Sequence, residues 1–262
     1  MAMQLAGFET TYATHRGTTR TVFRRGTGPA VIVMHEIPGI TPFVADFARI
    51  VADAGFTVYL PHLFGVPGKP ARLPYVTRSL VRACIGREFV CLAKGSPSPI
   101  TDWIRDLCHE ARDACGGPGV GAVGMCLTGN FALALMVDDV VAAPVLSQPS
   151  LPFPVPLTGA KHDLAIDEDQ LRAVKARVDA GCPVLGLRFH GDPLCPGERF
   201  DRLRKELGEG FEAIEIDPAH ANPTGNKPPH SVLTTDLIDE EGQPTREARD
   251  RVLSFFAERL KP

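Results

Sequence analysis

Cys126 is the residue whose type and surroundings most clearly indicate chemistry. It lies in the segment Gly121-Ala122-Val123-Gly124-Met125-Cys126-Leu127-Thr128-Gly129-Asn130, between an apolar run and an Ala- and Leu-rich run. Glycines on both sides permit the sharp strand-to-helix turn that exposes a nucleophile above a sheet. The next backbone N–H, that of Leu127, would then lie at a helix N-terminus, where it can stabilise an oxyanion. The pattern predicts a cysteine nucleophile, and the alternative is a buried cysteine that only packs.

An acid and a histidine follow in the chain order of a catalytic triad. Asp192 comes just after the apolar run 183–189, and His220 and His230 lie in the polar region after the last apolar run. In an α/β-hydrolase arrangement the order is nucleophile, acid, histidine. The acid would orient an imidazole that removes the thiol proton and later returns it. Both histidines are candidates, and we favour His230 because a Pro-Pro pair precedes it. The alternative interpretation of Asp192 is that it only forms a turn, because Gly-Asp-Pro is a typical turn sequence.

A metal site is a competing interpretation of the same region. His190, Asp192 and Cys195 can all ligate metals and lie within six positions of one another. Zinc sites usually have paired ligands at recognisable spacing and a second cluster elsewhere in the chain. We find no such second cluster, so the sequence predicts neither a metal nor another cofactor.

The elements that must hold these residues are predicted by periodicity. Buried strands are expected at the short apolar runs 30–34, 56–61, 120–123, 140–146, 183–189 and 211–216. Helices are expected between them, at 43–54, 100–114, 131–136, 170–180, 197–207 and 245–260. Strand-helix-strand order makes connected strands parallel, whereas 8–13 and 18–24 have the composition of an antiparallel hairpin. The predicted fold class is α/β, with a mostly parallel central sheet, helices on both faces and an N-terminal hairpin. No repeat or linker divides residues 1–262, so we expect one domain.

Bulk composition excludes several classes of function. The chain has 262 residues, 44% of them hydrophobic, and a net charge of −3, which does not suit a nucleic-acid partner. It contains no apolar run of about 18 residues that could span a membrane, and its N-terminus has no secretory pattern. Seven cysteines without a Cys-x-x-Cys pair predict reduced thiols and a cytoplasmic location. We expect a small-molecule substrate and a monomer or homodimer.

The stretch from His62 to Ser98 is the least regular part of the sequence. Prolines and glycines interrupt it, and we expect one short helix over 77–91. Two of its arginines, Arg78 and Arg82, are candidates for binding a substrate carboxylate by a fork-like contact. For either one, the alternative is a solvated helix face. The sequence leaves open whether this stretch forms a lid over the site.

The residues taken together resemble the dienelactone hydrolase family of α/β-hydrolases. The resemblance rests on His35-Glu36-Ile37-Pro38-Gly39 after a strand, on Gly124-Met125-Cys126-Leu127-Thr128-Gly129, on Asp192, and on the pair His230-Ser231. It covers most of the chain. It implies the α/β-hydrolase fold and a Cys-His-Asp triad.

The resemblance also assigns a role to each residue. Cys126 would be the nucleophile, His230 the base and Asp192 its orienter. The backbone N–H groups of Ile37 and Leu127 would form the oxyanion hole. Glu36 would contact the thiol and hold it poised until substrate displaces the carboxylate, because a nearby carboxylate repels the thiolate and raises the pKa of the thiol.

Two departures from the family pattern bear on the substrate. Thr128 stands where the family often has Gly. The resemblance also implies a carboxylate-binding arginine shortly after the catalytic histidine, and the segment after His230 contains none, so the sequence does not predict a dienelactone as the specific substrate. We therefore expect hydrolysis of a small ester or lactone through a thioester intermediate. One alternative is a broad carboxylesterase or thioesterase acting on small acyl groups. Another is a non-catalytic protein whose thiol senses redox state or whose pocket only binds a ligand.

Overall fold

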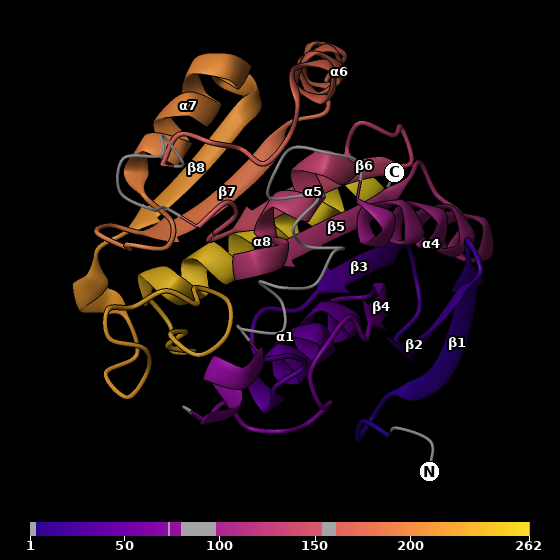
Figure 1. Ribbon diagram of the computed structural model, residues 1–262, viewed down its shortest axis with the longest axis horizontal. Coiled ribbons are helices and arrows are strands. Elements are labelled where there is room, and N and C mark those ends of the chain that lie inside the picture. Colours follow the sequence, from indigo (N-terminus) through magenta and orange to yellow (C-terminus); the bar gives the residue numbers. More distant parts are fainter. Residues whose placement is uncertain (1–3, 73, 80–97, 154–160, 262) are drawn as a thin grey trace.

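The protein is built on a sheet of eight strands. We describe it from a computed structural model, which describes residues 4–72, 74–79, 98–153 and 161–261. The strands lie in the order β1-β2-β4-β3-β5-β6-β7-β8 (Figure 1). Their bounds are β1 Glu9–His15, β2 Thr18–Arg25, β3 Ala30–Met34, β4 Thr57–Pro61, β5 Val120–Met125, β6 Val141–Ser147, β7 Val184–Phe189 and β8 Phe211–Ile216.

The strand directions confirm the predicted fold class. β1 pairs with β2, and β2 with β4, in antiparallel register. Every pair from β4 to β8 is parallel. The carboxyl ends of these parallel strands meet at one edge of the sheet, which is where open α/β sheets bind their ligands.

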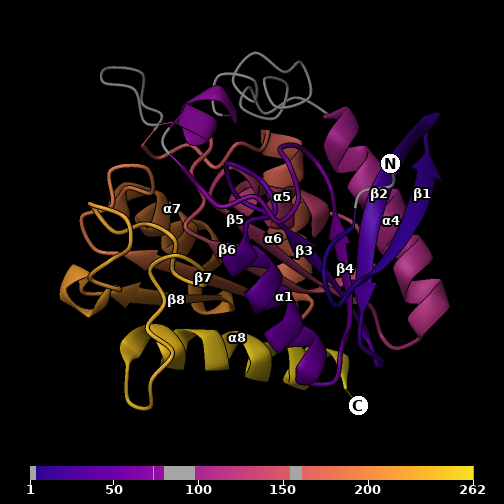
Figure 2. The ribbon, with the colours of Figure 1, turned by 90° about the horizontal axis from the view of Figure 1, so that it is seen from below.

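Helices cover both faces of the sheet, because the strands carry apolar side chains on both sides. In β5, Ala122 packs into one core cluster and its neighbour Val123 into the other. One cluster includes buried residues of α4, α5, α6 and α7, and the other those of α1 and α8 (Figure 2). The helices are α1 Pro42–Asp53, α4 Pro99–Cys115, α5 Gly129–Leu135, α6 Glu168–Asp179, α7 Gly197–Leu207 and α8 Pro244–Leu260.

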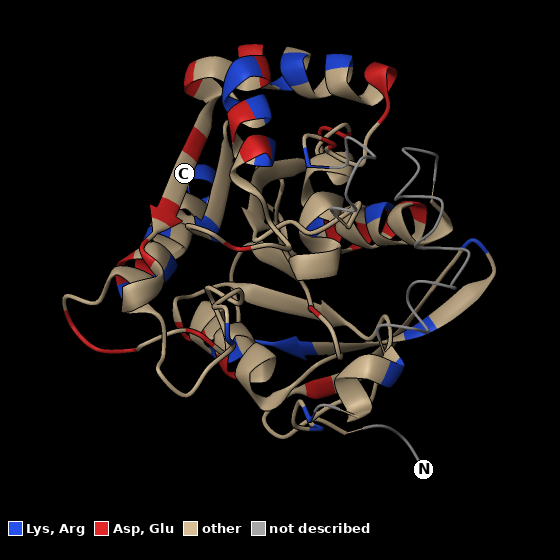
Figure 3. Ribbon diagram, turned by 60° about the vertical axis from the view of Figure 1, so that its left-hand side comes forward, with Lys and Arg blue, Asp and Glu red and all other residues tan. Residues whose placement is uncertain are grey.

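Charged residues lie mostly on the helices, the loops and the outer strands, while the central strands β3, β4, β5 and β6 carry none (Figure 3). Positive and negative residues are interspersed along the outer helices in the same view. Within the described ranges, no helix has the length and apolar character needed to cross a membrane. The helix expected over 77–91 lies mostly outside the described residues; its described beginning belongs to a helical turn at 74–79.

Candidate active site

Cys126 occupies a strained turn directly after β5. Its φ is 54°, in the left-handed region that side chains other than glycine rarely adopt. The chain here is too tight for side chains at the flanking glycines. A Cβ on Gly124 would lie 2.0 Å from the Thr128 carbonyl oxygen, and a Cβ on Gly129 would lie 2.6 Å from Pro149 Cα. The two glycines are therefore what lets β5 turn sharply into the short helix η1 (Cys126–Thr128), and strain of this kind is concentrated at functional positions.

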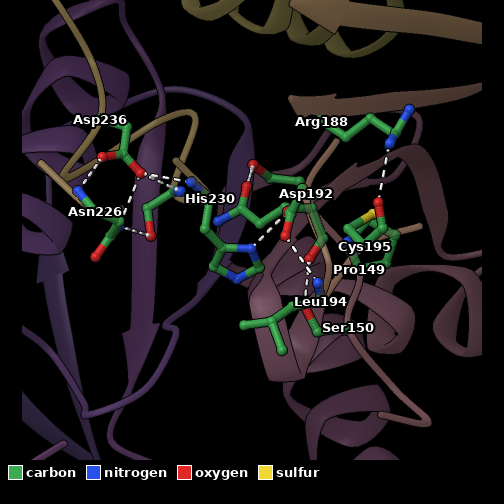
Figure 4. A network of polar contacts seen from close by, with 12 residues as sticks. Pro149, Ser150, Arg188, Asp192, Leu194, Cys195, Asn226, His230 and Asp236 are labelled. Atoms are coloured by element: carbon green, nitrogen blue, oxygen red, sulfur yellow. Dashed lines mark hydrogen bonds and ion pairs between the residues drawn. The ribbon is translucent and has the colours of Figure 1, made fainter. Parts of the chain in front are cut away.

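His230 and Asp192 form a buried pair beside this turn. The His230 Nδ1 lies 2.7 Å from Asp192 Oδ2 (Figure 4). The other ring nitrogen of His230, Nε2, is buried and has no hydrogen-bond partner in the described part of the chain. Burial by itself would lower the pKa of His230, but the electrostatic interaction with Cys126 and the hydrogen bond that the ring donates to Asp192 raise the pKa well above its usual value. The raised pKa favours the charged form of the His230 ring.

The loop that carries Asp192 is held in place by a hydrogen bond from a residue of β7. Arg188, in that strand, donates from Nε to the carbonyl oxygen of Cys195 at 2.9 Å (Figure 4). The Leu194 N–H donates to Asp192 Oδ1 at 2.9 Å. Asp192 is thus held at both carboxylate oxygens, one by its own loop and one by His230.

A second acid, Asp236, holds the histidine loop, and sequence reasoning missed it. This fully buried carboxylate accepts the backbone N–H groups of His230 at 2.8 Å and Ser231 at 2.7 Å. It also accepts the backbone N–H and the side-chain amide of Asn226, at 2.6 and 2.8 Å (Figure 4). An acid in a polar loop is ordinary in any sequence, so no local signal distinguishes Asp236.

His220, the competing histidine, is exposed in the short helix η3 (Pro218–His220). It is therefore His230 that the structure brings to Asp192. The metal candidates do not form a cluster: Asp192 faces His230, Cys195 is buried and His190 is exposed. The described ranges contain no group of three or more His, Cys, Asp or Glu residues that could hold a metal.

Glu36 lies just beyond β3 and is almost fully buried, with 4% of its surface exposed. Its Oε2 accepts from Ser231 Oγ at 2.8 Å and from Gln148 Nε2 at 3.3 Å, and the Thr234 hydroxyl donates to Oε1. Burial raises the pKa of Glu36, whereas these hydroxyls and the charge of His230 act in the opposite direction. The Cys126 sulfur is not among the hydrogen-bond partners of Glu36 in the described residues, so the contact with the thiol stays a prediction.

The two backbone groups expected to form the oxyanion hole come from neighbouring strands. Ile37 follows the end of β3, and Leu127 is the second residue of η1 after β5. The first N–H groups of a helix have no partner within the helix, and the role of the Leu127 N–H in an oxyanion hole stays a prediction. Ile37 borders the same cavity as Cys126.

That cavity has a volume of 750 Å³ and contains Cys126, His230, Asp192 and Glu36 in its lining. The rest of its wall is mostly apolar and is made by Ile37, Pro38, Ala71, Val76, Phe153, Pro193, Leu194 and Pro228. Lys227, which sequence reasoning also missed, is exposed and is the one lysine or arginine in the lining among the described residues.

Of the two arginines singled out from the sequence, the structure describes only Arg78, and Arg78 is not a lining residue of this cavity. Arg78 is exposed in the helical turn 74–79 and borders a neighbouring cavity of 590 Å³, together with Lys69 and Arg72. Arg82 lies outside the described residues. Binding of a substrate carboxylate by either arginine therefore stays a prediction.

A mostly parallel sheet with a candidate nucleophile in the turn after a central strand, and an acid and a histidine beyond later strands, defines an α/β-hydrolase. More specifically, the chain belongs to the dienelactone hydrolase family, whose family model matches residues 18–259. A comparison with curated protein sequences gave no match.

Solved structures share the fold along nearly the whole chain. A dienelactone hydrolase-like promiscuous phosphotriesterase from metagenomic libraries has 16% identity and a TM-score of 0.62, covering 97% of this chain and 98% of its own. The dienelactone hydrolase from Anabaena variabilis ATCC 29413 has 17% identity and a TM-score of 0.59, covering 97% and 98%. Est1E from Butyrivibrio proteoclasticus has 13% identity and a TM-score of 0.59, covering 95% and 98%. At these identities the likeness concerns the fold.

Proposed function

We propose that the protein hydrolyses a small carboxylic ester or lactone, with Cys126 as nucleophile, His230 as base and Asp192 as the residue that orients the base. One observation carries the proposal. His230 is bound to Asp192 at 2.7 Å through one ring nitrogen, while its other ring nitrogen is buried and lacks a hydrogen-bond partner in the described residues. A histidine held in this way is ready to exchange a proton with the nearby thiol.

The proposed reaction has two halves. The Cys126 thiolate attacks the carbonyl carbon, and the N–H groups of Ile37 and Leu127 stabilise the oxyanion that forms. His230 then gives its proton to the leaving alkoxide, which departs as an alcohol and leaves a thioester. In the second half His230 takes a proton from water, the hydroxide attacks the thioester, and the thiolate departs to release the acid. In a lactone the alcohol and the acid are parts of one product molecule.

The size and the lining of the cavity suit a small, largely apolar substrate. Apart from the polar groups around Cys126, its wall consists mainly of proline and aliphatic side chains with Phe153. A broad carboxylesterase or thioesterase would use the same machinery, and a panel of lactones against open-chain esters and thioesters separates the two. Because a phosphotriesterase is among the similar structures, a phosphotriester belongs in that panel. We further propose a cytoplasmic location and a monomeric or homodimeric state.

The experiment that tests the proposal is mass spectrometry of the purified protein mixed with a slowly deacylating nitrophenyl ester. We expect one acyl adduct on the peptide that contains Cys126. Cys126→Ala should form no adduct and lose nearly all turnover. An adduct on another residue, or full turnover by Cys126→Ala, would overturn the nucleophile assignment. Rapid oxidation of Cys126 by peroxide without any ester turnover would instead support a redox sensor.

A further inference from the structure

Thr128 carries a buried hydroxyl that joins the nucleophile turn to the neighbouring strand. Its Oγ1 lies 2.9 Å from the carbonyl oxygen of Met34, the last residue of β3, and 3.3 Å from that of His35. It also lies 3.0 Å from the Met125 carbonyl and accepts the Met125 N–H at 3.0 Å. One hydroxyl proton serves these carbonyls, and Met34 is the nearest of them. The hydroxyl therefore links the end of β3 to the turn after β5.

His35 holds the next peptide group along the chain. It is fully buried, and its Nε2 accepts the Leu63 N–H at 3.1 Å. An accepting Nε2 leaves the ring proton on Nδ1, which lies 3.1 Å from the Glu36 carbonyl oxygen and donates to it. Burial lowers the pKa of His35 to about 3, so the ring stays neutral at ordinary pH.

The Glu36 carbonyl and the Ile37 N–H belong to one planar peptide group, and in a trans peptide they point in opposite directions. The Glu36 oxygen accepts from His35 Nδ1 at 3.1 Å and also from the Gly39 N–H at 2.9 Å. Fixing this oxygen fixes the direction of the Ile37 N–H, which must point away from both donors. Ile37 is also a lining residue of the Cys126 cavity.

We propose that Thr128 and His35 are positioning residues that set the relative placement of the two oxyanion N–H groups, those of Ile37 and Leu127. This inference rests on the proposed function. Thr128 directly follows Leu127, and its hydroxyl bonds the strand end that leads to Ile37, so it connects the two halves of the hole. His35 then sets the orientation of the Ile37 half. A glycine in place of Thr128 would have no hydroxyl to make this link.

The test compares Thr128→Val, which removes the hydroxyl at similar volume, with Thr128→Ser, which keeps it. Two rates are measured at the same pH: hydrolysis of a nitrophenyl ester, and alkylation of Cys126 by iodoacetamide. Alkylation displaces iodide from carbon and forms no oxyanion, so it reports the reactivity of the thiolate alone. We expect Thr128→Val to lose roughly 10- to 100-fold in kcat, since removing one oxyanion donor outright costs about 100- to 1,000-fold. Its KM and its alkylation rate should stay within about twofold of the wild type, and Thr128→Ser should hydrolyse like the wild type.

His35 supplies a second pair of variants. His35→Asn retains an amide N–H near the position of Nδ1, and His35→Leu does not. We expect kcat to fall further in His35→Leu than in His35→Asn, again with alkylation preserved. This pair carries the test if Thr128→Val does not fold.

Two results would overturn the inference. One is hydrolysis by Thr128→Val at the wild-type rate. The other is a parallel fall of hydrolysis and alkylation, which would mean that Thr128 only supports the general structure of the turn. A wild-type protein that forms no acyl adduct would refute the proposed function itself, and the inference with it, so the two failures are distinguishable.

Discussion

Replacing Asp236 by asparagine should loosen the loop that carries His230, although Asp236 is not itself a lining residue of the cavity. The Asp236 carboxylate is fully buried and receives four hydrogen bonds, two of them from the backbone of His230 and Ser231 and two from Asn226. Asparagine has nearly the same shape but only one accepting oxygen. Its NH₂ group would have to face N–H donors that cannot accept a hydrogen bond.

The magnitude follows from the bonds that are lost. A hydrogen bond to a charged group contributes about 1.5–3 kcal/mol to stability. The amide can keep its oxygen at the Oδ2 position, where the backbone N–H groups of His230 and Ser231 and the side chain of Asn226 donate. Its NH₂ group then faces the backbone N–H of Asn226, which loses its acceptor, and the three remaining bonds weaken because the acceptor is no longer charged. Allowing for partial relaxation, we expect a loss of about 3 kcal/mol in the free energy of unfolding. For a chain of this size, 1 kcal/mol shifts Tm by roughly 2–4 °C, so Tm should fall by about 6–12 °C.

Activity should fall more steeply than stability alone explains. His230 is bonded to Asp192 at one ring nitrogen, and a displacement of about 1 Å can cost roughly 100-fold in rate. We therefore expect kcat to fall by about 100-fold at a temperature at which the variant is fully folded, with KM little changed.

The assay is calorimetry together with ester hydrolysis, and the control is Asp179→Asn. Asp179 is exposed at the end of α6, so the same change of charge there should stay within about 0.5 kcal/mol of the wild type. If Asp236→Asn melts within a degree of the control and keeps its kcat, the loop does not depend on this carboxylate and the reasoning is wrong.

Two further predictions concern histidines. His230→Ala should lose about 100- to 10,000-fold in kcat, whereas exposed His220→Ala should stay within about twofold of the wild type; the reverse result would transfer the base to His220. His35 has a pKa lowered to about 3 by burial, so below the ordinary pKa of about 6.5 the unfolded chain binds a proton that the folded chain does not. The contribution of His35 to the free energy of unfolding is thus fully present above about pH 6.5 and falls as the pH is lowered, by about 2 kcal/mol at pH 5. Urea unfolding of the wild type and of His35→Asn from pH 5 to pH 7 measures how the free energy of unfolding depends on pH. Glu36, whose pKa is raised, has the opposite effect in both proteins, so the difference between their two pH curves isolates the contribution of His35. Parallel curves would contradict the assignment.

The sequence by itself determined the class of the fold and the position of the candidate nucleophile. Both depend on local rules. Apolar runs of strand length between amphipathic helices can be recognised in the sequence, and they predicted the parallel strands of the sheet. The turn at Cys126 can be recognised in the sequence because part of its steric requirement is local: a Cβ on Gly124 would collide with the carbonyl oxygen of Thr128, four residues further along the chain.

Tertiary structure alone decided which residues surround that turn. The Pro-Pro pair before His230 favoured it over His220, but only folding places His230 Nδ1 2.7 Å from Asp192, 38 positions away. Asp236 and the Thr128 hydroxyl act through hydrogen bonds to other segments of the chain, and no local sequence pattern predicts either role. Arg78, a candidate substrate ligand in the sequence, borders a neighbouring cavity, a placement that depends on packing. Backbone sterics act between chain neighbours and can be read in order, whereas hydrogen-bond partners and cavity walls depend on how distant segments pack.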